Sequence, residues 1–296
     1  MTSKEVLDRI RDELDQYAAE LKAIDENAEL SVDQKKEERK KVKAARNRTV
    51  IDAWLPVDDA ASENRAKMAA ITITNDNYLD LGNGSYLDVV EAASRRVRIV
   101  KKPKGGKLPA LDSNVHQGFD FVGRLCDNLG MKLPDKLEIS VHGECERGSN
   151  VPITKNGARI DIILLARDDP NLGGGAGNAA HEMTHYMEAN APGLVAKLES
   201  FYQEITTNPT TGKQYPKKQI KGISGEMCRE SNIPIPVPED EEPETKVRIA
   251  EYTMRDYGDK TLHELLSMFV QAVYTDSYYV VSEYPEFFER IMKCLK

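Results

Sequence analysis

Residues 158–191 read ARIDIILLARDDPNLGGGAGNAAHEMTHYMEANA, and this stretch decides which fold the chain can form. Its first nine residues are mostly apolar and rich in isoleucine and leucine, which predicts a buried β-strand. A glycine-rich loop is expected at 173–177, followed by a helix from Asn178. That helix would have an apolar side formed by Ala179, Ala180, Met183 and Tyr186. A buried strand followed by such a helix is typical of an α+β domain.

The expected helix carries the motif His181-Glu182-Met183-Thr184-His185. Side chains at positions i and i+4 share one helix face, so both imidazoles can bind one metal ion with Glu182 beside it. Neutral imidazole is a good zinc ligand, and a carboxylate next to a zinc-bound water can accept its proton. The pattern also occurs by chance, as two surface histidines on an ordinary helix. The preceding strand and the apolar side of this helix favour a zinc site.

A catalytic zinc site needs a third protein ligand and an open fourth position. The all-histidine arrangement HExxHxxGxxH is excluded because Glu188 and Ala191 occupy its last two motif positions. We therefore expect a carboxylate on a later helix, and Glu264 in the first turn of an apolar helix is the first candidate. Thr261 and Glu264 also have the spacing of a capping box, so spacing alone leaves both interpretations open.

Other side chains are weaker candidates for the third ligand. Glu251 and His263 lie near Glu264 in the sequence, whereas His116 and His142 precede the motif on other predicted elements.

The first 55 residues predict a helical hairpin. Apolar residues follow alternating steps of three and four, as in a short coiled coil: Leu7, Ile10, Leu14, Tyr17, Leu21 and Ile24. A polar break follows at residues 25–30, after which Ser31 can cap a second helix. The seam of this hairpin offers a surface for self-association or for docking a partner.

Composition excludes several classes of protein. The chain has 49 Asp and Glu against 41 Lys and Arg, so we do not expect a nucleic-acid-binding protein despite the basic stretch 35–48. The longest apolar stretch is too short to span a bilayer, and the first residues lack the apolar core of a signal peptide. The four cysteines form no CxxC pair, which argues against a thiolate zinc finger or a disulfide scaffold. We expect a cytoplasmic chain with no membrane partner.

Two further regions complete the predicted organisation. Residues 56–111 are expected to be a linker with short strands, and residues 112–296 a compact α+β domain. Within that domain, the stretch 206–245 is expected to be an irregular surface loop or lid, because residues 234–244 contain four prolines and five acidic residues. We expect deletion of residues 211–245, with the ends joined by a short glycine linker, to leave a folded domain.

Several segments together resemble the catalytic domain of the anthrax lethal factor family of zinc peptidases. They are HEMTHYME at 181–188, DYG at 256–258, ELLSMFVQAVY at 264–274 and YPEFFERI at 284–291. That family pairs an HExxH helix with a glutamate ligand on a later helix, and a tyrosine seven residues before that glutamate faces the zinc. The resemblance covers roughly residues 112–296 and implies a zincin-like metallopeptidase domain, with a small sheet, an active-site helix and a ligand helix.

The resemblance also implies roles for individual residues. Zinc (Zn²⁺) would be bound by His181, His185 and Glu264. Glu182 would be the general base, and Tyr257 would donate a hydrogen bond to the tetrahedral oxyanion. Glu188 matches an acidic position that is a buried partner of the ligands in the family; a salt-bridged helix carboxylate is the alternative.

The predicted function is that of a zinc-dependent endopeptidase acting on protein or peptide substrates. A substrate could pair with the strand 158–166 as an added strand. Two departures from the family are Met268, where another acidic residue is common, and the long 206–245 segment. Such domains also occur in phage head-associated proteins and polymorphic toxins, so packaging in a virion is a second expected location. The alternative function is a virion-associated or other interaction protein with a vestigial or structural zinc site.

Overall fold

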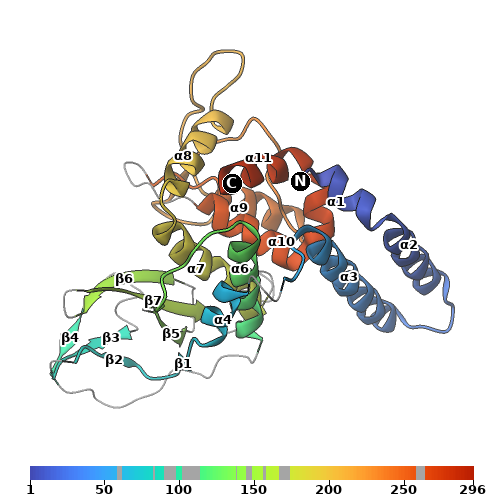
Figure 1. Ribbon diagram of the computed structural model, residues 1–296. Coiled ribbons are helices and arrows are strands. Elements are labelled where there is room, and N and C mark those ends of the chain that lie inside the picture. Colours follow the sequence, from blue (N-terminus) through green and yellow to red (C-terminus); the bar gives the residue numbers. More distant parts are fainter. Residues whose placement is uncertain are drawn as a thin grey trace. The chain divides into compact units, whose positions relative to one another are not determined.

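The computed structural model describes residues 1–58, 62–82, 84–89, 98–101, 114–137, 139–144, 149–155, 158–166, 174–257 and 264–296. The chain is a mixed α+β protein, as predicted. It divides into two compact units (Figure 1). The sheet unit is Asp58–Val195, and the helical unit combines Met1–Val57 with Ala196–Lys296. The predicted domain boundaries near residues 55 and 111 rest on composition and stay a prediction.

The sheet unit is built around four strands: β1 (Ile73–Thr74), β5 (Ile139–Glu144), β6 (Ser149–Lys155) and β7 (Ala158–Ala166). Their order is β1-β5-β7-β6, with β7 parallel to β5 and antiparallel to β6. The expected buried strand is therefore β7, and its apolar run suits a central position covered on both faces. Because β7 has a neighbour on each side, it has no open edge, and the prediction that a substrate pairs with it is wrong.

A second, three-stranded antiparallel sheet packs on one face of β7. Its strands are β2 (Tyr78–Asp80), β3 (Tyr86–Asp88) and β4 (Ile99–Val100). Leu87 of β3 shares a buried cluster with Ile162 and Leu164 of β7. Since side chains alternate along a strand, Ile163 and Leu165 point to the opposite face.

The described part of the sheet unit also contains the helices α4 (Glu63–Ala69), α6 (Val115–Asn128) and α7 (Gly174–Asn190). Helix α7 contacts both β7 and α6. The approach of α6 to α7 requires glycine at position 118, because a Cβ there would lie 2.0 Å from the carbonyl oxygen of Ala176. Helix α7 already begins at Gly174, so the prediction of a glycine loop through residue 177 is wrong. The small residues form the first turns of the helix and allow close packing.

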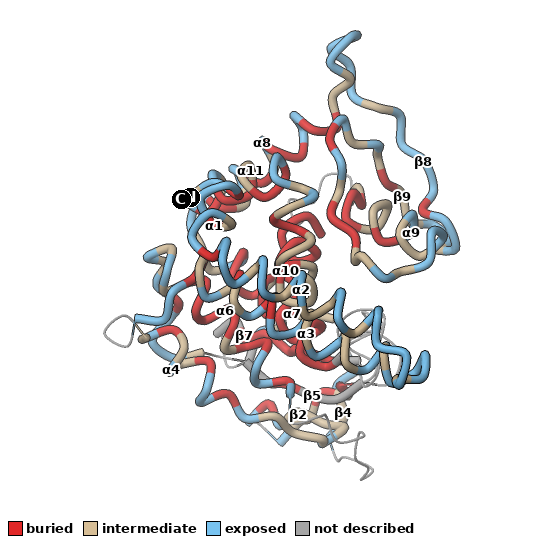
Figure 2. Tube along the Cα trace, turned by 90° about the vertical axis from the view of Figure 1, so that its right-hand side faces the viewer, coloured by how far each residue is buried: buried red, intermediate tan, exposed pale blue. Residues whose placement is uncertain are grey.

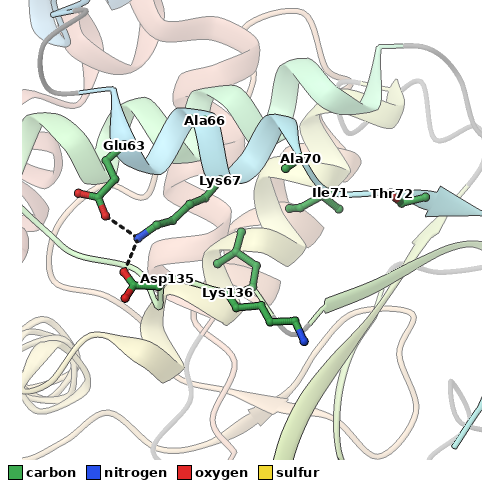
Figure 3. A pocket seen from close by; sticks show the side chains of 9 residues that line it. Glu63, Ala66, Lys67, Ala70, Ile71, Thr72, Asp135 and Lys136 are labelled. Carbon is green, nitrogen blue, oxygen red and sulfur yellow. Dashed lines mark ion pairs between the residues drawn. The ribbon is translucent and has the colours of Figure 1, made fainter. Parts of the chain in front are cut away.

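A surface pocket on the sheet unit lies beside α4 (Figure 3). The Nζ of Lys67 is 2.8 Å from a carboxylate oxygen of Glu63 and 3.5 Å from one of Asp135. The same Nζ donates a hydrogen bond to the carbonyl oxygen of Leu133 at 2.8 Å. Because the charge of Lys67 is already paired and the lining contains no histidine or cysteine, we assign the pocket no chemistry.

The helical unit begins with α1 (Ser3–Arg9), α2 (Arg11–Glu26) and α3 (Val32–Trp54). Ser31 caps α3 and forms a capping box with Gln34, in agreement with its predicted role. The predicted continuous seam is interrupted at Ile10, whose non-helical backbone separates α1 from α2. Helices α2 and α3 pack together as the expected hairpin.

The core of the helical unit surrounds α10 (Glu264–Glu283). Helices α3, α9 (Pro243–Thr253) and α11 (Pro285–Leu295) all contact it. The single tryptophan, Trp54, packs edge-on against Phe269 and Phe288. Figure 2 shows buried residues along α10 and α11. Helix α8 (Leu194–Ile205), nearly all of it in this unit, adds Phe201, which packs edge-on against Phe287.

The 206–245 segment packs against its unit. It contains the short hairpin of β8 (Lys218–Gln219) and β9 (Met227–Cys228). Ile220 and Cys228 are buried, and Val237 clusters with Ile249 and Met268. The prediction that this stretch offers little to a core is therefore wrong, because composition does not report these contacts. Met268, where the family often has an acidic residue, belongs to this apolar cluster.

None of the described helices is long and apolar enough to cross a membrane.

Candidate metal centre

Helix α7 positions the HExxH side chains inside the sheet unit. The imidazole rings of His181 and His185 lie one turn apart, with centroids separated by 5.0 Å and planes at 84°. His181 and Glu182 expose only 6% and 4% of their surfaces. Ala180, which precedes His181, is also buried, because the helix is covered on several sides. One buried and one half-buried histidine on one helix face fit a metal site better than two surface histidines.

Glu188 contacts the second histidine directly. Its Oε2 lies 3.1 Å from Nδ1 of His185, and its side chain is buried. A carboxylate at Nδ1 orients the imidazole and leaves Nε2 for a metal ion. This contact matches the partner role that the family resemblance implies.

Glu264 lies at the first residue of α10, in the helical unit, and its carboxylate has several polar neighbours. The hydroxyls of Tyr257 and Tyr252 donate hydrogen bonds to Oε1, the latter at 3.3 Å. The hydroxyl of Ser267 donates one to Oε2 at 3.2 Å. The guanidinium of Arg255 lies 3.7 Å from Oε1. These partners hold the buried carboxylate in one orientation.

Arg255 connects this carboxylate to the β8–β9 hairpin. It is buried, and its Nη2 lies 2.8 Å from Oε1 of Glu226, just before β9. Its guanidinium also lies over the ring of Tyr257, 4.3 Å from the centroid. The pKa of the Tyr257 hydroxyl is raised well above its usual range, first by burial and then by the negative charge of Glu264. Tyr257 is therefore a neutral hydrogen-bond donor.

Tyr252, Arg255 and Ser267 surround Glu264, and Glu226 pairs with Arg255; none of the four was predicted from the sequence. The three-residue spacing of Tyr252 and Arg255 at the end of α9 is a weak signal, and nothing in the sequence links Glu226 to them.

Among the described residues, His181, His185 and Glu264 form a group able to hold a metal ion. Each offers one ligand atom, and these atoms all lie within 4.8 Å of one another. Glu251 is engaged elsewhere, 3.1 Å from Nζ of Lys218. The other open alternatives, His263 as a ligand and Thr261 as a helix cap, lie outside the described residues.

Among the described side chains, His116 does not belong to this group. His116 is exposed on α6 and packs edge-on against Phe119. His142 is on β5, and its side chain is outside the described part of the structure.

Comparison with known proteins gives no relative. No family model matches the chain, and no match was found among curated proteins or among solved structures.

Proposed function

We propose that this protein is a zinc-dependent endopeptidase of the HExxH…E type. The observation that carries the proposal is the grouping of His181, His185 and Glu264, with Glu182 adjacent to the first histidine on α7. The sequence resemblance to the lethal factor family supports the same activity and a zincin-like domain. A location in a virion and a toxin role are further proposals from that resemblance alone.

The donor set fits zinc. Two imidazole nitrogens and one carboxylate oxygen are a known catalytic zinc ligand set, which leaves a fourth position for water or substrate. Bound zinc would supply Lewis acidity and lower the pKa of a coordinated water. Glu188 supports the choice, since a carboxylate at Nδ1 favours the tautomer of His185 that binds metal through Nε2.

The other catalytic roles belong to side chains of the protein. Glu182 accepts the proton of the attacking water and delivers it to the leaving amine. The hydroxyl of Tyr257, now bonded to Glu264, turns to donate a hydrogen bond to the oxyanion of the tetrahedral intermediate. The buried Arg255 stays next to the carboxylate of Glu264 when that hydroxyl leaves.

The substrate would pair with β6 rather than with β7. Among the described strands, β6 pairs only with β7, so its other edge can bind an extended peptide by main-chain hydrogen bonds. Helix α7 contacts β6, which places the pairing edge on an element next to the helix that carries the catalytic motif.

The test combines zinc analysis with peptide cleavage by purified full-length protein. We expect one zinc per chain after reconstitution and cleavage of a broad peptide library. Glu182→Gln should bind zinc but lose about a hundred- to ten-thousandfold in turnover, because the proton acceptor is gone. The matched control Glu37→Gln changes an exposed glutamate on α3 and should behave like wild type.

Two outcomes would contradict the proposal. If the wild-type protein binds no zinc, the proposed metal centre is wrong. Protein that holds zinc but cleaves no faster than Glu182→Gln favours the interaction protein with a structural or vestigial site.

A further inference from the structure

Helix α2 leaves its apolar side chains incompletely covered. None of its 16 residues is buried. Its seam residues Leu14, Tyr17, Leu21 and Ile24 are only half-buried, although α2 packs against α3. Helices α2 and α3 extend together away from the other helices of their unit (Figure 1), and α2 and the first half of α3 have only exposed and intermediate residues (Figure 2).

The cause is the polar character of α3 where it runs beside α2. Its contacts are with charged and polar groups: Arg39 pairs with Asp25 at 2.5 Å, and Nζ of Lys35 bonds to the carbonyl oxygen of Asp25 at 2.7 Å. The hydroxyls of Tyr17 and Thr49 form a further hydrogen bond at 3.0 Å. These bonds fix the hairpin but supply little apolar surface to cover the seam.

A helix of this length is marginally stable in water and depends on packing of its apolar face. A two-helix layer with a half-exposed seam lacks the second layer that would complete a core, as in a four-helix bundle. The apolar side chain of Val32, 84% exposed at the hairpin tip, extends the uncovered surface.

The charges of the hairpin indicate what covers it. Helix α2 has six acidic and two basic side chains, a net charge of −4, whereas α3 has eight basic and four acidic side chains, a net charge of +4. A surface with one acidic and one basic helix is complementary to itself. A two-fold axis parallel to the helices places α2 of each copy against α3 of the other, while a two-fold axis across the helices places like charges together.

We propose that the hairpin is a dimerisation surface and that a second copy of this chain occupies it. Two hairpins form an antiparallel four-helix bundle, with the α2 seams inside and the acidic and basic helices adjacent. The face is small, since 16 residues span about 24 Å. A weak, concentration-dependent dimer is therefore expected, and its formation is independent of the metal centre.

The experiment is sedimentation equilibrium of the full-length protein over a range of concentrations, at low and high salt. Wild type should dimerise, and the dissociation constant should rise several-fold with salt because the opposite charges are screened. Lys36→Glu/Lys40→Glu on α3 and Asp15→Lys/Glu26→Lys on α2 should each raise it about tenfold or more, since each removes the charge of one helix. All four side chains are exposed.

Mixing the two double variants is the decisive experiment, because unfolding of a variant cannot produce stronger heterodimer formation. The unaltered acidic α2 of one variant faces the unaltered basic α3 of the other, so heterodimers should form more strongly than either homodimer. Lys132→Glu/Lys213→Glu, which changes net charge equally at exposed sites elsewhere, should dimerise like wild type. The proposal would be overturned if the wild type is monomeric at about 100 μM. It would also be overturned if the mixture associates no more strongly than either double variant alone.

Discussion

Tyr257 and Tyr252 offer a comparison between two residues that share one acceptor. Both hydroxyls donate to Oε1 of Glu264. Only Tyr257 has the position, seven residues before that glutamate, that the family resemblance assigns to an oxyanion donor. The guanidinium of Arg255 also lies over the ring of Tyr257, 4.3 Å from its centroid, and supports the side chain from one face.

Replacing Tyr257 with phenylalanine should therefore impair catalysis more than binding. We expect kcat to fall by roughly a hundred- to a thousandfold with little change in KM or zinc content, because one donor to the oxyanion is lost. Tyr252→Phe removes another hydrogen bond to the same carboxylate oxygen and serves as the matched control, with a small effect on kcat. Equal losses in the two variants would assign Tyr257 a role in supporting Glu264 only.

At the scale of residues, the sequence predicts contacts between residues that are close along the chain. His181 and His185 are one helical turn apart, so their shared face follows from helix geometry. Glu188, three residues after His185, was implied by the family resemblance, and its contact is also local to the helix. Arg255 and Glu226 meet only because a hairpin from the 206–245 segment returns to the end of α9, and no short-range pattern records that contact.

At the scale of elements, α10 is interrupted where it packs against α3. Asp276 has non-helical backbone angles, φ −146° and ψ 62°. Asn47 of α3 satisfies the backbone beside this interruption, donating to the carbonyl oxygen of Thr275 at 3.0 Å and accepting from the N–H of Tyr278 at 3.2 Å. Oδ1 of Asp276 is shielded from solvent and has no hydrogen-bond partner among the described residues.

Asp276 should make the stability of the protein depend on pH. Burial, and then the charge of Glu239, raises the pKa of Asp276, while Arg46 and Lys43 oppose the rise. A raised pKa in the folded state means that the folded protein holds the proton more tightly. Stability is therefore lost as pH rises from the ordinary value near 3.8 through the raised one.

The variant Asp276→Asn tests this sign. At pH 7 it should be more stable than wild type by about 1–3 kcal/mol, because the shielded charge is absent. The difference should vanish near pH 3, where the wild-type carboxyl is protonated in both states. Thermal melts across this pH range measure it, and a less stable variant at pH 7 would show that Arg46 outweighs burial.

Elements with a clear local pattern were predictable, and elements defined by packing were not. The strand β7 and the helix α6 follow from runs of apolar residues and from Gly130, which has a positive φ of 65° just after α6. The start of α7 was predicted four residues late because glycines normally indicate a loop. Here the small residues belong to the helix, because its first turns pack closely against α6, where Gly118 lies next to Ala176.

At the scale of the whole molecule, the proposed ligands come from both units: His181 and His185 from the sheet unit, and Glu264 from the helical unit. A ligand that binds only the folded state stabilises it by mass action, about 2.7 kcal/mol at a concentration one hundred times its dissociation constant. If Glu264 binds the same ion as the histidines, zinc must stabilise the helical unit as well.

Trp54 makes this testable, because the only tryptophan of the chain is buried in the helical unit. Zinc at saturating concentration should raise the midpoint of the thermal transition followed by Trp54 fluorescence by roughly 5–10 °C. His181→Ala should abolish the shift although it alters the other unit, and so should Glu264→Gln, which keeps the side-chain volume. His116→Ala, which removes an exposed histidine, should retain it. Zinc that binds through His181 yet leaves the Trp54 transition unmoved would exclude Glu264 as the third ligand, because its unit would then gain nothing from the ion.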